Sequence, residues 1–327
     1  MTVLITGGAG YFGSLLSTYL VKSGIQVVVY DKLLYGGEGL LSVIGSANFQ
    51  LIIDDIRNRA ALSSAIKKAD AVVHLAALVG EEACLVDPAA TIAINVQATK
   101  QLVKMARTSG VKRLIFSSTC SNYGRVDTNS IADEDWPLRP LSLYAQTKID
   151  AEGIILRASS KNFSTCVLRF GTICGLSPRM RFDLLVNDMA RSAALGKTIT
   201  IFAPNAWRPF LHIRDAAEII YRCLTTQTQN IAGQIFNVVG ENYQKKQLAQ
   251  LVIKHFPAVP IDIKKRPSAT RDYRVSAERI AKKIHFHPNH SIKEAFIEVA
   301  DAVKNGIFPD PFRTIYDTLP DKKQLSD

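Results

Sequence analysis

The sequence has little cysteine and no long apolar run. Its five cysteines, among 327 residues, are odd in number and lack the spacing of metal ligands, so we expect reduced thiols and no metal site. No apolar run approaches the roughly 18 residues that a membrane-spanning helix needs. The amino-terminal segment is apolar and lacks the basic lead-in of a signal peptide. We therefore expect a cytoplasmic protein with no membrane contact.

Acidic residues are fewer than basic ones, 29 against 40, which gives a formal net charge of +11. Such an excess raises the possibility of nucleic-acid binding, because lysines and arginines neutralise phosphates. The basic residues are scattered in short groups, however, and no basic helix with interleaved aromatic residues stands out. We expect no nucleic-acid partner, and an anionic small substrate explains part of the excess.

A glycine-rich turn follows the first apolar segment. Gly7 and Gly10 lie between the strand-like segment Val3–Thr6 and the helix-like segment Tyr11–Lys22, and Gly13 lies in the first turn of that helix. This spacing lets the backbone turn sharply, lets a diphosphate approach without meeting a Cβ atom, and lets the helix pack closely on its strand. Amide N–H groups in the first helical turn, strengthened by the helix dipole, would hold the phosphates. The pattern predicts a dinucleotide-binding site.

An acidic residue ends the second apolar segment. Asp31 follows Ile25–Tyr30 and lies 18 residues after Gly13, close to the ~20 expected of a ribose-binding acid. Its carboxylate would accept hydrogen bonds from both ribose hydroxyls and would repel the 2′-phosphate of NADP. We therefore expect NAD as the cofactor, with NADP as the alternative because Lys32 is adjacent.

Strand-like and helix-like segments alternate along the chain, without internal repeats. The strands expected after the first two are Gln50–Ile53, Ala71–His74, Arg113–Phe116, Thr165–Arg169 and Gln234–Val239, and the helices are Ala60–Lys68, Pro88–Ser109 and Leu143–Ala158. Such alternation is typical of a parallel sheet with helices on both faces. We predict an α/β fold with a doubly wound, Rossmann-type parallel sheet and a smaller C-terminal lobe.

Two domains are expected from the same pattern. Residues 1–171 would form the dinucleotide-binding domain and residues 172–327 the substrate lobe, with the chain returning to the sheet around 208–240. The tail Ile307–Asp327 is longer than the fold needs, and we expect it either to wrap the smaller lobe or to extend freely.

Three residues are candidates for catalysis. Tyr144 and Lys148 lie one turn apart on the same face of the expected helix Leu143–Ala158. A nearby ammonium group favours the phenolate, which would lower the pKa of Tyr144 towards working pH and make it a proton acceptor. Thr119 follows a buried strand at the carboxyl edge of the sheet, where its hydroxyl could meet the reacting oxygen. The alternatives are a surface pair and an ordinary polar turn.

These residues belong to a longer series of motifs that carries a resemblance. The series is Thr6–Gly13, Asp31, Asp55–Ile56, His74–Ala77, Asn95, Ser117–Gly124, Tyr144–Lys148, Leu168–Gly175, Arg208–Asp215, Phe236–Gly240 and Arg271–Ser276. Along essentially its whole length the chain resembles the extended short-chain dehydrogenases/reductases, the family of NAD-dependent nucleotide-sugar epimerases, dehydratases and reductases. Within it, the pattern is most similar to the UDP-glucose 4-epimerase-like members.

The resemblance implies a role for each matching residue. Tyr144 would be the catalytic base, Lys148 its partner and a ribose ligand, and Thr119 the hydroxyl beside the substrate. The implied cofactor-binding residues are Gly7, Gly10, Tyr11, Phe12, Gly13, Asp31, Lys32, Asp55, Ile56, Leu75, Ala76, Ala77, Asn95, Ser117, Tyr144 and Lys148. The implied substrate-binding residues are Thr119, Thr172, Arg208 and Arg271. Asn95 would also help to hold the catalytic helix, and for Arg208 and Arg271 an ordinary surface ion pair is the alternative.

The positions after Thr119 distinguish the reactions of the family. Relatives that dehydrate a sugar carry an Asp-Glu pair there, and relatives that epimerise next to a ketone place a cysteine two positions after the hydroxyl residue. This chain has Cys120 and Ser121. The resemblance therefore implies a nucleotide-sugar 4-epimerase that oxidises C4 transiently. A C4 ketoreductase or 4-dehydrogenase is the alternative, and a non-catalytic NAD(H)-sensing or scaffold protein is the alternative from another class.

Partners are also implied by the resemblance. The substrate would be a nucleotide-diphosphate sugar, and the segment 177–187, with Arg179 and Arg181, would lie over it. A homodimer would form through the long helix bearing Asn95 and the catalytic helix. The apolar residues Ile92, Val96, Val103, Ile154 and Ile155 suit such an interface or a buried core equally.

Overall fold

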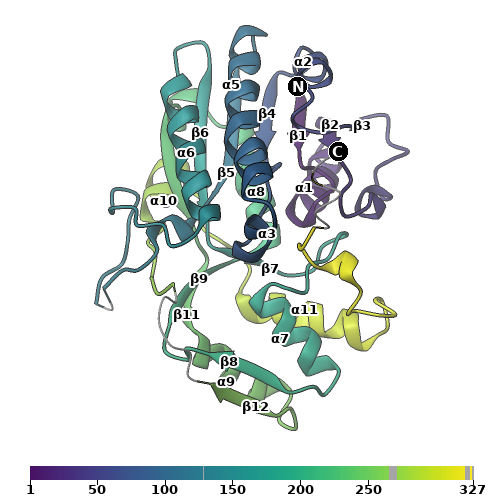
Figure 1. Ribbon diagram of the computed structural model, residues 1–327, viewed down its shortest axis with the longest axis vertical. Helices are drawn as coiled ribbons and strands as arrows, with labels where there is room; N and C mark the ends of the chain where they lie inside the picture. Colours follow the sequence, from purple (N-terminus) through teal and green to yellow (C-terminus); the bar gives the residue numbers. More distant parts are fainter. Residues whose placement is uncertain (128, 265–270, 321–324, 326–327) are drawn as a thin grey trace.

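The protein consists of a large parallel sheet with helices on both faces and a smaller lobe at the carboxyl ends of the strands (Figure 1). The structure is a computed structural model that describes residues 1–127, 129–264, 271–320 and 325. The strand order in the large sheet is β10-β6-β5-β4-β1-β2-β3. Its strands are β1 (Thr2–Thr6), β2 (Gln26–Asp31), β3 (Phe49–Ile53), β4 (Ala71–His74), β5 (Arg113–Thr119), β6 (Ser164–Phe170) and β10 (Gln234–Val238). This is the doubly wound order, and the predicted fold class is confirmed.

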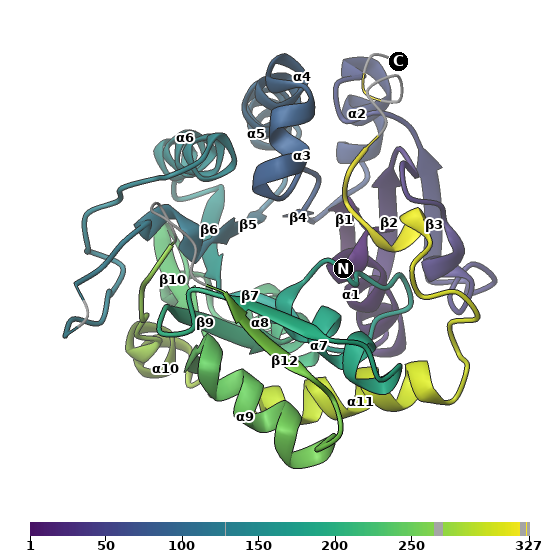
Figure 2. The same ribbon diagram turned by 60° about the horizontal axis from the view of Figure 1, so that its bottom comes forward.

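Helices cover both faces of this sheet, as Figure 2 shows. One face carries α1 (Tyr11–Lys22), α8 (Ile213–Thr225) and α10 (Glu278–Ile284), and the other carries α2 (Arg59–Ile66), α5 (Thr99–Thr108) and α6 (Leu143–Ala158). Strand β1 shows why both faces need a cover. Its Val3 and Ile5 pack under the first set of helices and Leu4 under the second, as the two-residue period of a strand requires.

The segment predicted as one helix from Pro88 to Ser109 is interrupted. It consists of α4 (Pro88–Ile92), a π-helical stretch (Ala93–Ala98) and α5, preceded by a short helix α3 (Glu81–Val86). Asn95 lies in the π-helical stretch, and its amide side chain bonds both backbone groups of Leu78 after β4. Such local widening of a helix is frequent at functional sites.

The smaller lobe is built from stretches on both sides of α8 and β10. A three-stranded sheet contains β7 (Thr172–Cys174), β9 (Trp207–His212) and β11 (Glu241–Gln244), and a parallel pair joins β8 (Ile199–Phe202) to β12 (Ile261–Lys264). Helices α7 (Leu185–Ala194), α9 (Lys245–His255) and α11 (Ile292–Lys304) surround a separate apolar core. The chain thus returns to the large sheet through α8 and β10, while the division at residue 171 stays a prediction.

The C-terminal tail wraps the smaller lobe and reaches the large domain. After α11 it passes through a short 3₁₀ turn (Thr314–Tyr316), where the rings of Phe308 and Tyr316 pack edge-on against Phe182. Figure 2 shows the tail, in yellow, continuing past β2 and β3 towards α2. Residues 321–324, 326 and 327 of the tail lie outside the described residues. Among the residues that are described, no helix has the length and apolar content to cross a membrane.

Candidate active site

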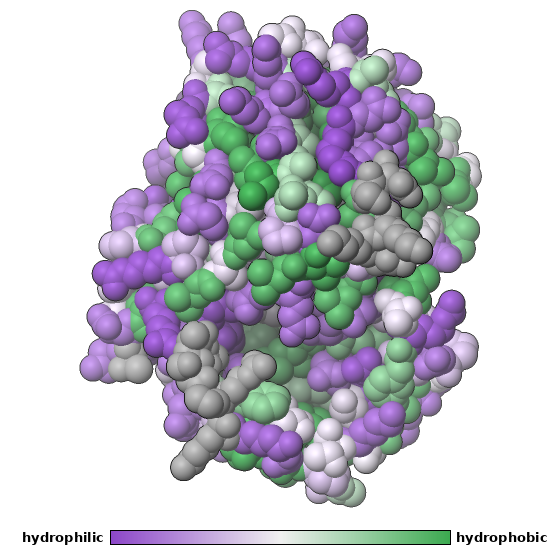
Figure 3. Space-filling view, viewed as in Figure 1, coloured by the Kyte–Doolittle hydropathy of each residue, from purple (hydrophilic) through white to green (hydrophobic). Residues whose placement is uncertain are grey.

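A cleft of about 550 Å³ lies between the carboxyl ends of the large sheet's strands and the smaller lobe, and Figure 3 shows the surface hollowed there. Its lining includes Gly7, Gly10, Tyr11, Phe12, Gly13, Asp31, Lys32, Asp55, Ile56, Leu75, Ala76, Ala77, Ser117, Thr119, Tyr144, Lys148, Thr172, Arg208 and Arg271. Asn95 is the exception among the predicted site residues. It lies behind the wall and donates to the Leu78 carbonyl at 3.0 Å and to Thr147 of α6 at 3.2 Å.

At Gly7 and Gly13 the glycine turn has no room for a side chain. Gly7 has a φ of +76°, and a Cβ atom there would lie 2.7 Å from the amide nitrogen of Ala76. A Cβ at Gly13 would lie 2.1 Å from the carbonyl oxygen of Gly7. Helix α1 begins after Gly10 with no side-chain cap and no acidic residue in its first turn. Its first amide groups are thus available to an anion, and the turn fits a dinucleotide diphosphate.

Asp31 ends β2 at the edge of the glycine turn. Its Oδ2 accepts from the amide of Ala9 at 2.9 Å, and its Oδ1 accepts from the amide of Leu33 at 2.8 Å. Burial raises the pKa of the carboxyl group, and these two hydrogen bonds oppose the shift. The carboxylate therefore holds the turn in shape, and its remaining lone pairs can accept ribose hydroxyls.

Lys32 pairs with Asp55. Its Nζ lies 3.2 Å from Asp55 Oδ2, and Arg57 binds the same carboxylate through Nε at 2.9 Å and Nη2 at 2.7 Å. Burial alone would raise the pKa of Asp55, but the hydrogen bonds from Arg57 and Lys32 outweigh it and lower the pKa to about 2. Lys32, whose position beside Asp31 made NADP the alternative, is thus bound by Asp55.

Helix α6 brings the two candidate catalytic residues to the opposite wall. Ser142 caps the helix by accepting from the amide of Ala145, and Tyr144 and Lys148 follow one turn apart. Lys148 Nζ donates to the carbonyl of Ser117 at 2.9 Å and lies 4.7 Å from the ring centroid of Phe116. Burial lowers the pKa of Lys148 to about 8. Its ammonium is thus held at the end of β5, beside the cofactor wall.

The expected lowering of the Tyr144 pKa is wrong. Burial raises this pKa to about 12, and the opposing effects of Arg181, of a hydrogen bond with Thr119 and of Arg271 are smaller. A buried phenolate loses its hydration, which disfavours the charged form. Lys148 does not compensate, because its Nζ is bonded to Ser117 and lies 6.0 Å from the Tyr144 ring centroid.

Two predicted substrate arginines lie in the cleft in different states. Arg208 is 8% exposed and donates to the Trp207 carbonyl at 2.9 Å, but it forms no ion pair with a carboxylate of the described residues. Burial lowers its pKa to about 10. Arg271 instead lies 3.1 Å from Glu81 and donates to Ser121 Oγ at 2.7 Å. Of these two arginines, Arg271 has a carboxylate partner, and Arg208 has none among the described residues.

A buried ion pair behind the reaction centre has no signal in the sequence. Glu152 of α6 and Arg169 of β6 pair at 2.7 Å with side chains almost fully buried. Glu152 also accepts from Ser118 and, at 2.8 Å, from Asn122, on either side of Thr119. Cys120 points away from the cleft and donates its thiol to the Arg169 carbonyl at 3.2 Å. The pair thus fixes the backbone that presents Thr119.

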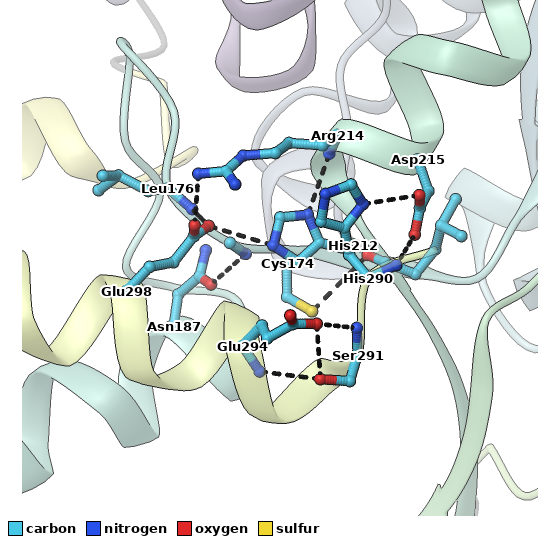
Figure 4. A network of polar contacts seen from close by, with 12 residues as sticks. Cys174, Leu176, Asn187, His212, Arg214, Asp215, His290, Ser291, Glu294 and Glu298 are labelled. Carbon is cyan, nitrogen blue, oxygen red and sulfur yellow. Dashed lines mark hydrogen bonds and ion pairs between the residues drawn. The ribbon is translucent and has the colours of Figure 1, made fainter. Parts of the chain in front are cut away.

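A second network, shown in Figure 4, anchors the loop between β7 and α7. Glu298 of α11 accepts from the amide of Leu176 at 2.7 Å and lies 3.3 Å from His212 Nε2. The His212 ring stacks on His290 with 4.8 Å between centroids, and His290 bonds Asp215 at 2.8 Å. Helices α8 and α11 thereby hold the start of the loop that crosses the cleft.

Comparison with known proteins decides the family. The model described as "NAD dependent epimerase/dehydratase family" matches residues 3–239. The chain belongs to this family. The chain has the fold of the extended short-chain dehydrogenases/reductases, and the cofactor of the protein is NAD. The resemblance inferred from the motifs is confirmed, as is the expectation of an NAD-dependent enzyme.

Similar proteins include epimerases. A UDP-glucose 4-epimerase of Rhizobium meliloti is 35% identical over 242 residues, which cover 68% of this chain and 71% of the relative. A UDP-glucose 4-epimerase of Bacillus subtilis is 28% identical over 276 residues, 76% of this chain and 80% of the relative. A solved UDP-glucuronic acid 4-epimerase from Bacillus cereus, in complex with UDP-glucuronic acid and NAD, superposes with a TM-score of 0.84 at 25% identity. That alignment covers 93% of this chain and 99% of the other.

Proposed function

We propose that the protein is a 4-epimerase of UDP-sugars that oxidises C4 transiently and reduces it from the other face. The observation that carries the proposal is the meeting of Thr119, Tyr144 and Lys148 in the same cleft as the diphosphate cradle. The relatives named above, 25–35% identical, include UDP-sugar 4-epimerases.

Each residue then has a chemical role. Tyr144 takes the proton of the C4 hydroxyl, and Thr119 donates a hydrogen bond to the same oxygen. Lys148 binds a ribose hydroxyl, and its positive charge, one helical turn from Tyr144, acts in the direction of the phenolate. NAD, when bound, supplies the acceptor and the donor of the hydride. For the return step, Tyr144 gives its proton back to the C4 oxygen after the ketone has presented its other face.

The positions after Thr119 support this reaction over the others of the family. A dehydratase needs an acid and a base to remove water across two carbons, but Cys120 and Ser121 follow Thr119. Cys120 is buried, and burial raises the pKa of its thiol, so it is no base. What remains in the cleft suits hydride chemistry at one carbinol.

Arg208 is the proposed ligand of the substrate's diphosphate. It is buried, lines the cleft and forms no ion pair with a described carboxylate, and a guanidinium fork suits phosphate oxygens. Thr172 at the start of β7 lines the same part of the cleft and can hydrogen-bond the substrate. Arg271 donates to Ser121 and pairs with Glu81. To contact the sugar nucleotide, it would have to break the ion pair with Glu81.

Homodimer formation and a cytoplasmic location stay predictions. Of the apolar residues considered for a dimer interface, Val103 and Ile155 are buried in the core of the large domain. Ile92 is 42% exposed and remains available for an interface.

The proposal is tested by incubating the protein and NAD with UDP-, GDP-, dTDP- and CDP-hexoses, while NADH absorbance and the NMR spectrum of the sugar are followed together. Inversion of C4 in a UDP-sugar without accumulating NADH is the expected result. A ketone formed together with an equal amount of NADH would show a 4-dehydrogenase instead. A protein that binds NAD and turns over none of these sugars would favour a sensing role.

A further inference from the structure

The loop after β7 lies directly on the first turn of α1. Ser177 Oγ donates to the Tyr11 carbonyl at 2.6 Å, and the Tyr11 hydroxyl donates to the Gly175 carbonyl at 2.7 Å. The amide of Arg179 donates to Ser14 Oγ at 3.2 Å. Arg179 is therefore fixed, by its own backbone, beside the helix terminus that fits the cofactor's diphosphate.

The guanidinium of Arg179 is a buried cation with no ion-pair partner among the described residues, and the carboxylates of Asp183 and Asp31 act on it only from farther away. The residue is 6% exposed, lines the cleft and stacks on Tyr35 with 4.5 Å between the guanidinium carbon and the ring centroid. Its buried Nε has no hydrogen-bond partner, and it forms no ion pair with a carboxylate among the described residues. Burial and, next, the nearby Arg181 lower its pKa to about 10. A buried charge without a counter-charge is costly unless a ligand supplies one.

Neighbouring arginines of the same lobe differ in this respect. Arg181 pairs with Asp183, and Arg191 pairs with Asp188. Arg179 instead donates through its Nη2 to two neutral groups, the carbonyls of Ile315 at 3.1 Å and Asp317 at 2.8 Å. These contacts orient the guanidinium without neutralising it.

The C-terminal tail holds this arrangement over the cleft. The Tyr35 hydroxyl, after β2, donates to the Thr318 carbonyl at 2.9 Å, and Thr318 Oγ1 donates to Asp183 at 3.0 Å. Leu325, further along the tail, is buried in the same apolar core as Ile56 and lines the cleft. The tail segment 314–318 therefore connects the cofactor domain to the loop that carries Arg179.

We propose that Arg179 binds the diphosphate of NAD from the side of the smaller lobe, and that the tail segment 314–318, by holding Arg179, slows the release of the cofactor. The diphosphate then lies between the amides of α1 and the guanidinium of Arg179. Release requires the contacts of Tyr35 and Arg179 with the tail to open. An enzyme that returns the hydride to the same substrate gains from this, because its cofactor need not leave.

The test measures binding to full-length protein freed of nucleotide, with NAD, ADP, adenosine and 2′-AMP as probes in competition with NADH fluorescence. Arg179→Met is expected to weaken NAD and ADP about 10- to 100-fold, the range for hydrogen bonds to a charged group. Adenosine, which has no phosphate, is expected to bind within about twofold of the wild type. Because the readout is binding, it is independent of the proposed epimerase reaction.

Two matched variants sharpen this result. Arg191→Met also removes an arginine that donates to a tail carbonyl, that of Pro311 at 3.2 Å, but Arg191 does not line the cleft. It is expected to leave all four probes unchanged. Arg179→Lys keeps the charge and is expected to retain most of the affinity for ADP.

Three outcomes would overturn the proposal. Equal losses for ADP and adenosine would show a merely structural role for Arg179, and unchanged ADP binding would remove the role altogether. Loss of 2′-AMP binding with ADP retained would place a 2′-phosphate, not the diphosphate, at Arg179.

The role of the tail is tested by Tyr35→Phe, which removes only the hydroxyl that bonds Thr318. The variant keeps the ring under Arg179, so folding is not at issue. NADH, chased with excess NAD, is expected to leave several-fold faster than from the wild type. Release at the wild-type rate would contradict the part of the proposal that concerns the tail.

Discussion

Along the large sheet the cleft is lined by backbone amides and small residues, whereas the smaller lobe lines it with guanidinium groups. The glycine turn and the start of α1 offer shape and helix polarity to a ligand, while Arg179 and Arg208 offer side-chain charge. A wall made of backbone is disturbed mainly where a new Cβ atom intrudes. In a wall made of arginines, replacing one arginine removes a charge and a set of hydrogen-bond donors and so changes which anion is bound. We therefore attribute cofactor binding to the first wall together with Arg179, and substrate choice to the other arginines of the second wall.

The largest expected effect is at Tyr144, where the two walls meet. Tyr144→Phe removes the proton acceptor but no group of either wall that holds a phosphate. Turnover should fall about 10³-fold, within the usual range for a general base, while binding of NAD and UDP stays within about twofold. Steady-state kinetics and calorimetry measure the two quantities. A variant that keeps more than a tenth of the activity would mean that another group takes the proton.

The backbone wall is tested by Gly7→Ala. The new Cβ would lie 2.7 Å from the amide of Ala76 at a residue with φ of +76°, and we expect NAD affinity to fall roughly 100-fold through strain of a few kcal/mol. Gly24→Ala is the control, because Gly24 has a φ of +77° with nothing within 4 Å. It should lower stability by about 1 kcal/mol and leave NAD binding unchanged. Equal losses of NAD affinity in both variants would mean that the effect of Gly7→Ala is general backbone strain and not a loss of the diphosphate site.

The arginine wall is tested by Arg208→Met. We expect UDP affinity to fall about 10-fold or more, as for a lost charged hydrogen bond, with NAD affinity unchanged. Titrations with UDP and with uridine separate loss of the diphosphate contact from loss of the base contact. If uridine loses as much as UDP, Arg208 supports the lobe and does not bind phosphate.

The smallest effect expected is on stability, and it depends on pH. The pKa of Lys148 is lowered from its usual value near 10.5 to about 8, so between pH 8 and 10.5 the unfolded chain binds more protons and stability rises with pH. Lys148→Met should therefore stabilise the cofactor-free protein by about 1–2 kcal/mol at pH 7, after the lost bond to Ser117 is discounted.

This gain should shrink as the pH approaches 10. Urea unfolding of wild type and Lys148→Met across pH 7–10 measures the difference. A constant difference would mean that Lys148 is not buried as a charged group.

What could be predicted from the sequence follows the same division. The glycine turn, Asp31 and the spacing of Tyr144 and Lys148 are local patterns, since each is contained in one strand, turn or helix. The structure places these residues on the predicted strands, turn and helices, and helix α6 has the predicted bounds. The contact of Lys148 with Ser117 needs only that α6 packs on the neighbouring strand β5.

The rest depends on pairs that are distant in the chain. Arg179 meets carbonyls 136 and 138 residues away, and no periodicity links them. Glu152 and Arg169 pair only because α6 packs on β6. The prediction of a lowered pKa for Tyr144 fails for a similar reason. Helical spacing identifies the neighbour Lys148, but it does not show that burial raises the pKa of the phenol.

The most direct test of transient oxidation at C4 follows deuterium through one reaction. A UDP-hexose carrying deuterium at C4 is incubated with the enzyme and excess unlabelled NAD, and the product is examined by NMR and mass spectrometry. Our account requires the C4 epimer to keep its deuterium, with no deuterated NADH in solution. Loss of the label to free NADH or to water would contradict an epimerase that holds its cofactor and returns the same hydride.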